Sequence, residues 1–210
     1  MGHVVLLGDS IFDNAAYVAG GPDVISQLRE RLPSGWRATL NAVDGNITHD
    51  VARQLAALPG DATRLVLSIG GNDVLSRAGL LEEGARSVAE ALSRVADARA
   101  SFHGDYRNML DGVIATGLPL AVCSIYDARF PEPQRRIAAA GLAAFNDVIT
   151  REVFARGLPL IDLRLVCDDD GDFANPIEPS VQGGAKIAAA IAGLLAGHDF
   201  ARRQSSVFVR

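Results

Sequence analysis

Short apolar runs alternate with longer segments of helical periodicity along most of the chain. The runs lie at residues 4–7, 64–69, 118–125 and 158–163; residues 36–43, in which apolar and polar side chains alternate, are a further candidate strand, and glycine or polar turns bound all five segments. Apolar runs of this length are typical of parallel strands that are buried on both faces. Apolar residues recur three or four positions apart in the other segments, which predicts helices at 22–32, 48–58, 80–117, 135–156 and 180–196.

This alternation predicts an α/β fold in which helices cover both faces of a five-stranded parallel sheet. A barrel of eight strand–helix units typically needs about 250 residues, more than the 210 of this chain. No repeat, low-complexity linker or change in composition divides the sequence, so we expect one domain over residues 1–210.

Three further segments are interpreted from their polar residues. His103-Gly104 predicts a break between two helices within 80–117. The aspartates between Cys167 and Asn175 predict a solvated acidic loop, in which Asp172 is a candidate for orienting a site. The tail from His198 onward is largely polar, and we expect it to be frayed or bound at an interface.

Composition narrows the classes of partner and the compartment. The hydrophobic content of 49% is enough for a large core, and the net charge of −5 argues against a nucleic-acid partner. No apolar stretch reaches the roughly 18 residues of a membrane span, so we expect no membrane association. Cys123 and Cys167 fit buried free thiols. The N-terminus lacks the basic segment of a signal peptide, which predicts a cytoplasmic protein.

Polar, glycine-rich turns follow the first three predicted strands. They carry Asp9-Ser10, Gly45-Asn46 and Gly71-Asn72-Asp73. Because the carboxyl ends of parallel strands meet at one edge of a sheet, we expect these turns to converge. A serine surrounded by backbone N–H groups and an amide is suited to acyl transfer, with the serine as nucleophile and the donors stabilising the oxyanion. Each turn alone is equally consistent with ordinary turn glycines and capping residues.

These motifs resemble those of the SGNH (GDSL) hydrolases. Gly8-Asp9-Ser10, Gly45 and Gly70-Gly71-Asn72-Asp73 look like the first three motif blocks of that family, and Pro179-Ser180 looks like part of the last. The resemblance implies a flavodoxin-like three-layer α/β/α fold and hydrolysis of a small-molecule ester without a metal or organic cofactor. It also implies that Ser10 is the nucleophile and first oxyanion donor, that Gly45 adds a backbone N–H, and that Asn72 adds its side-chain amide.

The last block departs from the family pattern Asp-x-x-His-Pro-Ser. Glu178 stands where the histidine base is expected, and Asn175 stands where the aspartate that orients it is expected. A carboxylate with an ordinary pKa of about 4.3 is a weak proton acceptor for serine, but burial raises that pKa toward neutrality. We therefore expect Glu178 to be the base, with Asn175 as its support.

Two other interpretations stay open from the sequence. Another residue could supply the base, and His49 is the histidine expected at the correct edge of the sheet. Alternatively, the fold has lost hydrolysis and binds an acyl or carbohydrate ligand. An acyltransferase that uses the same serine would carry the same motifs, and the oligomeric state is not indicated by the sequence.

Overall fold

A computed structural model describes residues 2–209 of the chain. Its main sheet has the strand order β2-β1-β3-β4-β5-β8, and every neighbouring pair is parallel. The strands are β1 His3–Gly8, β2 Arg37–Leu40, β3 Arg64–Ser68, β4 Leu120–Cys123, β5 Leu160–Ile161 and β8 Val207–Phe208. The predicted α/β fold class is confirmed, and the sheet has six strands rather than five.

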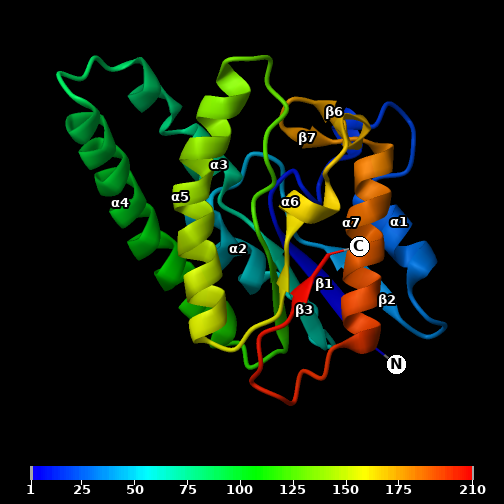
Figure 1. The fold of residues 1–210 in the computed structure, drawn as a ribbon. Coiled ribbons are helices and arrows are strands. Elements are labelled where there is room, and N and C mark those ends of the chain that lie inside the picture. Colours follow the sequence, from blue (N-terminus) through cyan, green and yellow to red (C-terminus); the bar gives the residue numbers. More distant parts are fainter. Residues whose placement is uncertain (1, 210) are drawn as a thin grey trace.

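Helices cover both faces of this sheet (Figure 1). Alternate strand residues face opposite layers, so Val4 and Leu6 pack in one core with α1 Val24–Arg31 and α7 Val181–Gly197. Val5 and Leu7 pack in the second core with three helices on the other face of the sheet. Those helices are α2 Val51–Ala56, α4 Val88–Ile114 and α5 Gln134–Ala155. The two cores give the three layers that the sequence implied.

Shorter elements lie mostly in the connections between strands and helices. They are the α-helical turns α3 Gly71–Leu75 and α6 Leu163–Val166, and the 3₁₀ turns η1 Ala15–Tyr17, η2 Thr48–Asp50, η3 Ala78–Glu82 and η4 Asp170–Asp172. A small antiparallel hairpin, β6 Phe173–Asn175 and β7 Glu178–Pro179, precedes α7. No helix within residues 2–209 has the length and apolar character needed to cross a membrane.

The expected break at His103-Gly104 is wrong. Helix α4 runs without interruption through both residues, because Phe102 and Tyr106 are fully buried against α5 and His103 pairs with Glu152 of that helix. Tertiary packing therefore outweighs the roughly 1 kcal/mol that a helical glycine costs.

The expectation of a frayed tail is also wrong. Strand β8 extends the sheet, with the Leu160 N–H donating to the Ser206 carbonyl at 2.8 Å and the Asp162 N–H donating to the Phe208 carbonyl at 2.9 Å. Phe208 also packs against the core, where its ring meets that of His198. Two apolar residues in a polar segment are too short a signal for a strand.

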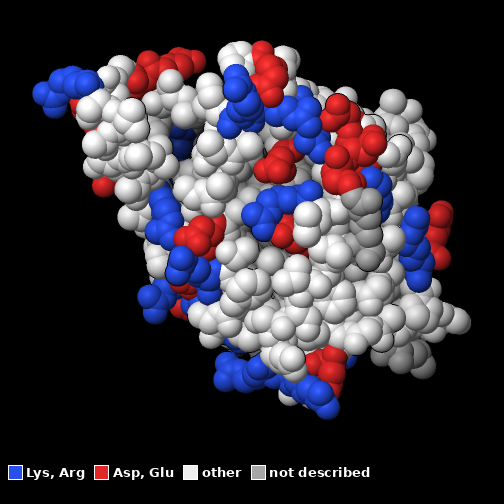
Figure 2. Space-filling model, in the orientation of Figure 1, with Lys and Arg blue, Asp and Glu red and all other residues white. Residues whose placement is uncertain are grey.

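The acidic loop is only partly solvated. Asp168, Asp169 and Asp170 are exposed, and Figure 2 shows acidic and basic side chains interspersed on this face of the molecule. Asp172 is fully buried and accepts hydrogen bonds from Lys186 at 2.7 Å and from the Gln182 amide at 3.0 Å. Asp172 therefore fastens the loop to the start of α7.

Candidate active site

Ser10 lies in a tight turn at the C-terminal end of β1. Gly8 has a φ of 134°, and a Cβ there would lie 1.7 Å from the Ser68 carbonyl oxygen, so only glycine fits. The Asp9 carbonyl accepts from the N–H groups of Phe12 and Asp13, both at 3.1 Å. This turn holds Ser10, which is 6% exposed, at the sheet edge where the sequence predicted a nucleophile.

Glu178 is brought to Ser10 from the far end of the chain. The Ser10 hydroxyl donates to Glu178 Oε1 at 3.1 Å, and the glutamate is itself only 6% exposed. Glu178 belongs to β7, whose partner β6 follows the acidic loop. The pair meets the distance requirement for proton transfer between a nucleophile and a base.

The surroundings of Glu178 favour its protonated form. Its Oε2 atom is buried without a hydrogen-bond partner among the described residues. Burial raises the pKa of Glu178 to about 7, the hydrogen bond from Ser10 opposes this, and the negative charge of Asp44 adds to it. A carboxylate with such a pKa accepts a proton far more readily than an ordinary glutamate.

Two backbone anchors hold the residues on either side of Glu178. The Tyr126 hydroxyl donates to the Ile177 carbonyl at 2.6 Å, and the Asn14 amide donates to the Pro179 carbonyl at 3.2 Å. Both side chains are buried. Sequence reasoning missed these anchors, although Asn14 lies four residues after Ser10 and Tyr126 directly follows the fourth predicted strand.

Asn175 is not brought to the Glu178 carboxylate. Its side-chain oxygen accepts from the Ile177 N–H at 2.9 Å, and the residue is exposed in β6 opposite Glu178. No hydrogen bond between the two side chains occurs within the described residues. Asn175 therefore shapes the hairpin turn that carries Glu178.

The three predicted donor groups retain hydrogen-bonding capacity. Among residues 2–209, the backbone N–H groups of Ser10 and Gly45 have no hydrogen-bond acceptor. Gly45 is exposed, with a φ of 80°. Asn72 Nδ2 donates to the Asn46 carbonyl at 2.9 Å, which uses one of its two protons and leaves the other available.

Buried side chains connect the three turns to one another. Gln54 accepts from the Gly8 N–H at 2.8 Å and donates to the Gly8 carbonyl at 2.7 Å and to Asn46 Oδ1 at 2.9 Å. Asp73 accepts from both the N–H and the hydroxyl of Thr48, at 3.0 and 2.8 Å. These long-range contacts, which sequence reasoning also missed, fix the turns after β1, β2 and β3 against one another.

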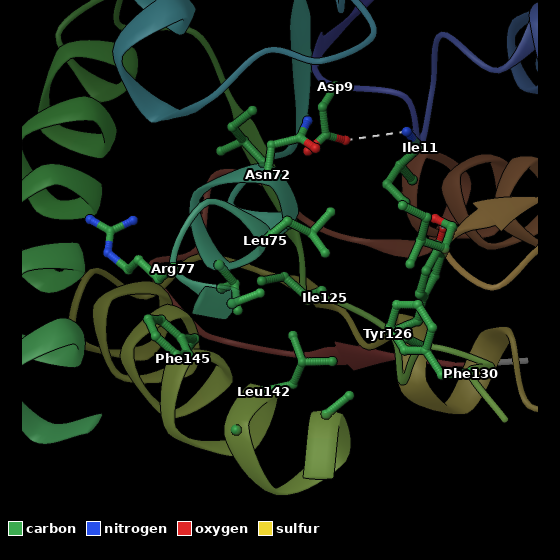
Figure 3. A pocket seen from close by; sticks show the side chains of 18 of the residues that line it. Asp9, Ile11, Asn72, Leu75, Arg77, Ile125, Tyr126, Phe130, Leu142 and Phe145 are labelled. Carbon is green, nitrogen blue, oxygen red and sulfur yellow. Dashed lines mark hydrogen bonds between the residues drawn. The ribbon is translucent and has the colours of Figure 1, made fainter. Parts of the chain in front are cut away.

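Asp9 is a second buried carboxyl group beside Ser10. Its Oδ1 accepts from the Ile11 N–H at 3.2 Å, as Figure 3 shows, and the Asn72 side chain lies close to it in that view. Burial raises the pKa of Asp9 to about 8; the hydrogen bond from Ile11 opposes this, and the negative charges of Glu178, Asp73 and Asp44 add to it. The raised pKa favours the uncharged form of Asp9, which reduces the negative charge beside Glu178.

None of the four histidines lines the cavity that Ser10 faces. His3 contacts Asp61 and Thr39, His103 contacts Glu152, and His198 packs against Phe200. His49 is exposed in η2 and lines a separate groove against α4. Within residues 2–209, no three His, Cys, Asp or Glu side chains are grouped so that they could hold a metal ion.

Comparisons with known proteins agree with this geometry. The model of the GDSL-like lipase/acylhydrolase family matches residues 6–185, so the chain belongs to that family. It is a carboxylic ester hydrolase by this membership. Among curated proteins, no sequence matches the chain.

Solved structures with low sequence identity share the fold. An extracellular lipase from Streptomyces rimosus superposes with a TM-score of 0.65 at 19% identity, covering 91% of this chain and 100% of the lipase. A phospholipase A1 from Streptomyces albidoflavus gives 0.65 at 17% identity, with 94% and 99% covered. A carbohydrate acetylesterase from Sinorhizobium meliloti gives 0.65 at 11% identity, with 93% and 99% covered. At these identities the likeness extends to the fold alone.

Proposed function

We propose that the chain hydrolyses esters through an acyl-enzyme on Ser10, with Glu178 as the base in place of a histidine. The observation that carries the proposal is the 3.1 Å hydrogen bond from the Ser10 hydroxyl to Glu178, a buried glutamate that forms no ion pair with another described residue. A carboxylate in this position needs no histidine to reach the serine proton.

The reaction proceeds in two halves. Ser10 Oγ attacks the ester carbonyl carbon while its proton passes to Glu178, and the protonated Glu178 then gives that proton to the departing alcohol. In the second half, Glu178 takes a proton from water, the resulting hydroxyl attacks the acyl carbon, and the proton returns to Ser10 as the acid leaves. Base catalysis of this kind contributes roughly 10²–10⁴ in rate.

Three donors stabilise the oxyanion in both halves. They are the Ser10 and Gly45 N–H groups and the free proton of Asn72 Nδ2. The hydrogen bond from Asn72 to the Asn46 carbonyl supports this role because it fixes the amide before substrate arrives. Preorganised donors of this type cost no reorganisation when the charge develops. Asn175 acts indirectly, by holding the hairpin turn.

The test is turnover of p-nitrophenyl acetate and butyrate, together with labelling by a fluorophosphonate probe. We expect the wild-type protein to turn over at least one ester and to form a Ser10 adduct, and Ser10→Ala to do neither. Absence of both turnover and adduct in the wild type would overturn the proposal in favour of a non-catalytic binding protein.

A second arm identifies the base. Glu178→Gln should reduce turnover strongly, whereas His49→Ala should leave it unchanged because His49 lies in a different groove. Full activity in Glu178→Gln together with loss in His49→Ala would move the base to His49. Transfer of the acyl group to an added alcohol in place of water would identify an acyltransferase.

A further inference from the structure

A cavity of about 200 Å³ opens beside Ser10, and its polar groups are concentrated at one end. Figure 3 shows Asp9 and Asn72 at that end, while Leu75, Ile125, Leu142 and Phe145 surround the rest. The apolar walls come from α3, η3, α4, α5 and the segment after β4. The reacting serine therefore lies at one end of an apolar cavity.

The charged residue Arg77 lines the cavity without directing its charge into it. In Figure 3 its guanidinium extends toward α4. It donates to the Asp73 carbonyl at 2.6 Å and lies 3.6 Å from the Asp105 carboxylate. Its aliphatic stem is thus the part that can face a ligand.

The spread of α4 away from α5 creates this space. The two helices pack through Phe102 and Phe145, whose ring centroids are 5.3 Å apart, and Figure 1 shows them diverging toward their N-termini. Leu75, Leu81 and Ile137 line the cavity and yet are 40%, 57% and 46% exposed. Large apolar side chains left open to water around a cavity indicate an apolar ligand.

The turn that carries Asp44 and Gly45 has a different character from the cavity. Neither residue lines the cavity; both are exposed in a polar turn, and the Tyr17 hydroxyl donates to Asp44 at 2.7 Å. An ester has two substituents on its reacting group. The apolar cavity suits its acyl chain, and the exposed polar turn suits its alcohol.

We propose that this cavity binds the acyl chain of the substrate and makes the protein selective for medium-chain acyl esters, an inference that rests on the proposed function. A volume of about 200 Å³ compares with about 30 Å³ for one water molecule in the liquid, and a methylene group is of similar size. Hexanoyl to octanoyl chains match this space. An acetyl group leaves the cavity empty, and sugar hydroxyls placed in it would lose hydrogen bonds to water without finding partners.

The first experiment measures kcat/KM for p-nitrophenyl acetate, butyrate, hexanoate, octanoate and laurate. Burying each methylene should raise kcat/KM about fourfold until the cavity is full. We expect octanoate to exceed acetate by at least about a hundredfold, with no further gain at laurate. A flat series, or one that is highest at acetate, would overturn the proposal.

A parallel series separates the two ends of the ester. Acetate esters of ethanol, butanol and octanol extend the alcohol while the acyl group stays short. We expect little gain along this series because the alcohol faces the polar turn. A steep rise here, with none along the acyl series, would assign the cavity to the alcohol and contradict the proposal.

Gly141 offers a way to fill the cavity. It lines the cavity from α5, and a Cβ at this position meets no atom within 4 Å. Gly141→Trp should bring the ratio of octanoate to acetate kcat/KM down to near one, and the smaller Gly141→Leu, which suits a helix well, should lower it partly. Gly193 of α7, exposed and equally unobstructed, supplies the control: Gly193→Trp should leave the ratio unchanged.

A binding measurement keeps this inference separable from catalysis. Ser10→Ala protein is titrated with octanoate and with acetate by calorimetry, with and without Gly141→Trp. Saturable octanoate binding that Gly141→Trp removes supports the acyl cavity even if no hydrolysis is found. Hydrolysis without octanoate binding and without chain-length preference would refute the cavity assignment and leave the proposed function intact.

Discussion

Two buried glutamates in this molecule have opposite surroundings. Glu152 is 9% exposed and Glu178 is 6% exposed, so both are removed from water to a similar degree. Burial raises the pKa of Glu152, but hydrogen bonds from His103 and Arg156 outweigh it, and the net shift is downward. Within residues 2–209, Glu178 has a serine hydroxyl as its hydrogen-bond donor and no cationic partner, and its pKa rises to about 7.

The difference separates a structural ion pair from a group that can move a proton. The His103–Glu152 pair, at 2.5 Å, has the composition of an acid–base pair but joins α4 to α5 and does not line the cavity beside Ser10. Hydrogen bonds from His103 and Arg156 favour the ionised form of Glu152. Glu178 is held by its backbone, at Ile177 and Pro179, and its carboxyl group is left to change protonation state near neutral pH.

The largest expected effect distinguishes the two residues by activity. Glu178→Gln should lower kcat by about 10²–10⁴ because the serine proton loses its acceptor. Glu152→Gln, a substitution of the same chemistry and similar burial, should leave kcat within about twofold, since it touches nothing beside Ser10. The measurement is kcat for one ester in both variants. An equal loss of kcat in the two would contradict the distinction between Glu178 and Glu152.

Replacing Glu178 or Glu152 by glutamine should change the stability of the fold in opposite directions at pH 8. The raised pKa of Glu178 means that the folded state holds a proton that the unfolded state has lost between about pH 4.5 and 7, so stability falls as pH rises through this window. Glu178→Gln should therefore raise Tm at pH 8 and have little effect at pH 4. Each 1 kcal/mol corresponds to about 2–4 °C for a chain of this size.

Glu152 has a lowered pKa and contributes stability that is present at neutral pH and lost as the pH falls through its folded value. At pH 8, Glu152→Gln should lower the free energy of unfolding by about 1–3 kcal/mol and lower Tm accordingly. At pH 4 the decrease should be smaller. Thermal denaturation of Glu178→Gln and Glu152→Gln at pH 4 and pH 8 tests these two expectations. A shift of the same sign for both at pH 8 would show that their surroundings do not differ as described.

The anchor of Glu178 should have an intermediate effect on rate. Tyr126→Phe removes the donor to the Ile177 carbonyl and keeps the ring that packs against Phe173. Loss of one such bond, worth about 0.5–1.5 kcal/mol, should lower kcat by about tenfold or less, with KM less affected. If Tyr126→Phe lowers only Tm and leaves kcat unchanged, the tyrosine supports the fold and does not position the base.

Part of the candidate site could be predicted from the sequence. Ser10, Gly45 and Asn72 each follow a strand, so a local pattern was enough to bring them to one sheet edge. Glu178 stood out because it occupies a motif position with the wrong side chain.

The supporting contacts could not be predicted in the same way. Gln54, Asn14 and Tyr126 act on backbone groups 46, 165 and 51 residues away, and no periodicity connects such positions. The cavity beside Ser10 depends on how far α4 diverges from α5, and the packing of whole helices decides that divergence. Asn175 is the opposite case. Its position in the motif predicted a contact with Glu178, but its side chain accepts a hydrogen bond from the Ile177 N–H instead.

The smallest expected effect concerns Asp44, whose charge helps to raise the pKa of Glu178. Asp44→Asn removes that charge without touching Ser10, so the apparent pKa of the acid limb of kcat/KM should move downward. The shift should be smaller at high salt, because a charge exposed to solvent is screened. An upward shift would contradict the electrostatic description of Glu178.

The central claim, that Glu178 accepts the Ser10 proton, is tested most directly by the pH dependence of fluorophosphonate labelling at Ser10. In the wild-type protein the rate should rise with pH through an apparent pKa of about 7, the value at which Glu178 becomes able to accept a proton. In Glu178→Gln the limb should disappear and the rate should fall by about 10²–10⁴. A Glu178→Gln protein that keeps both the rate and the limb would contradict the claim.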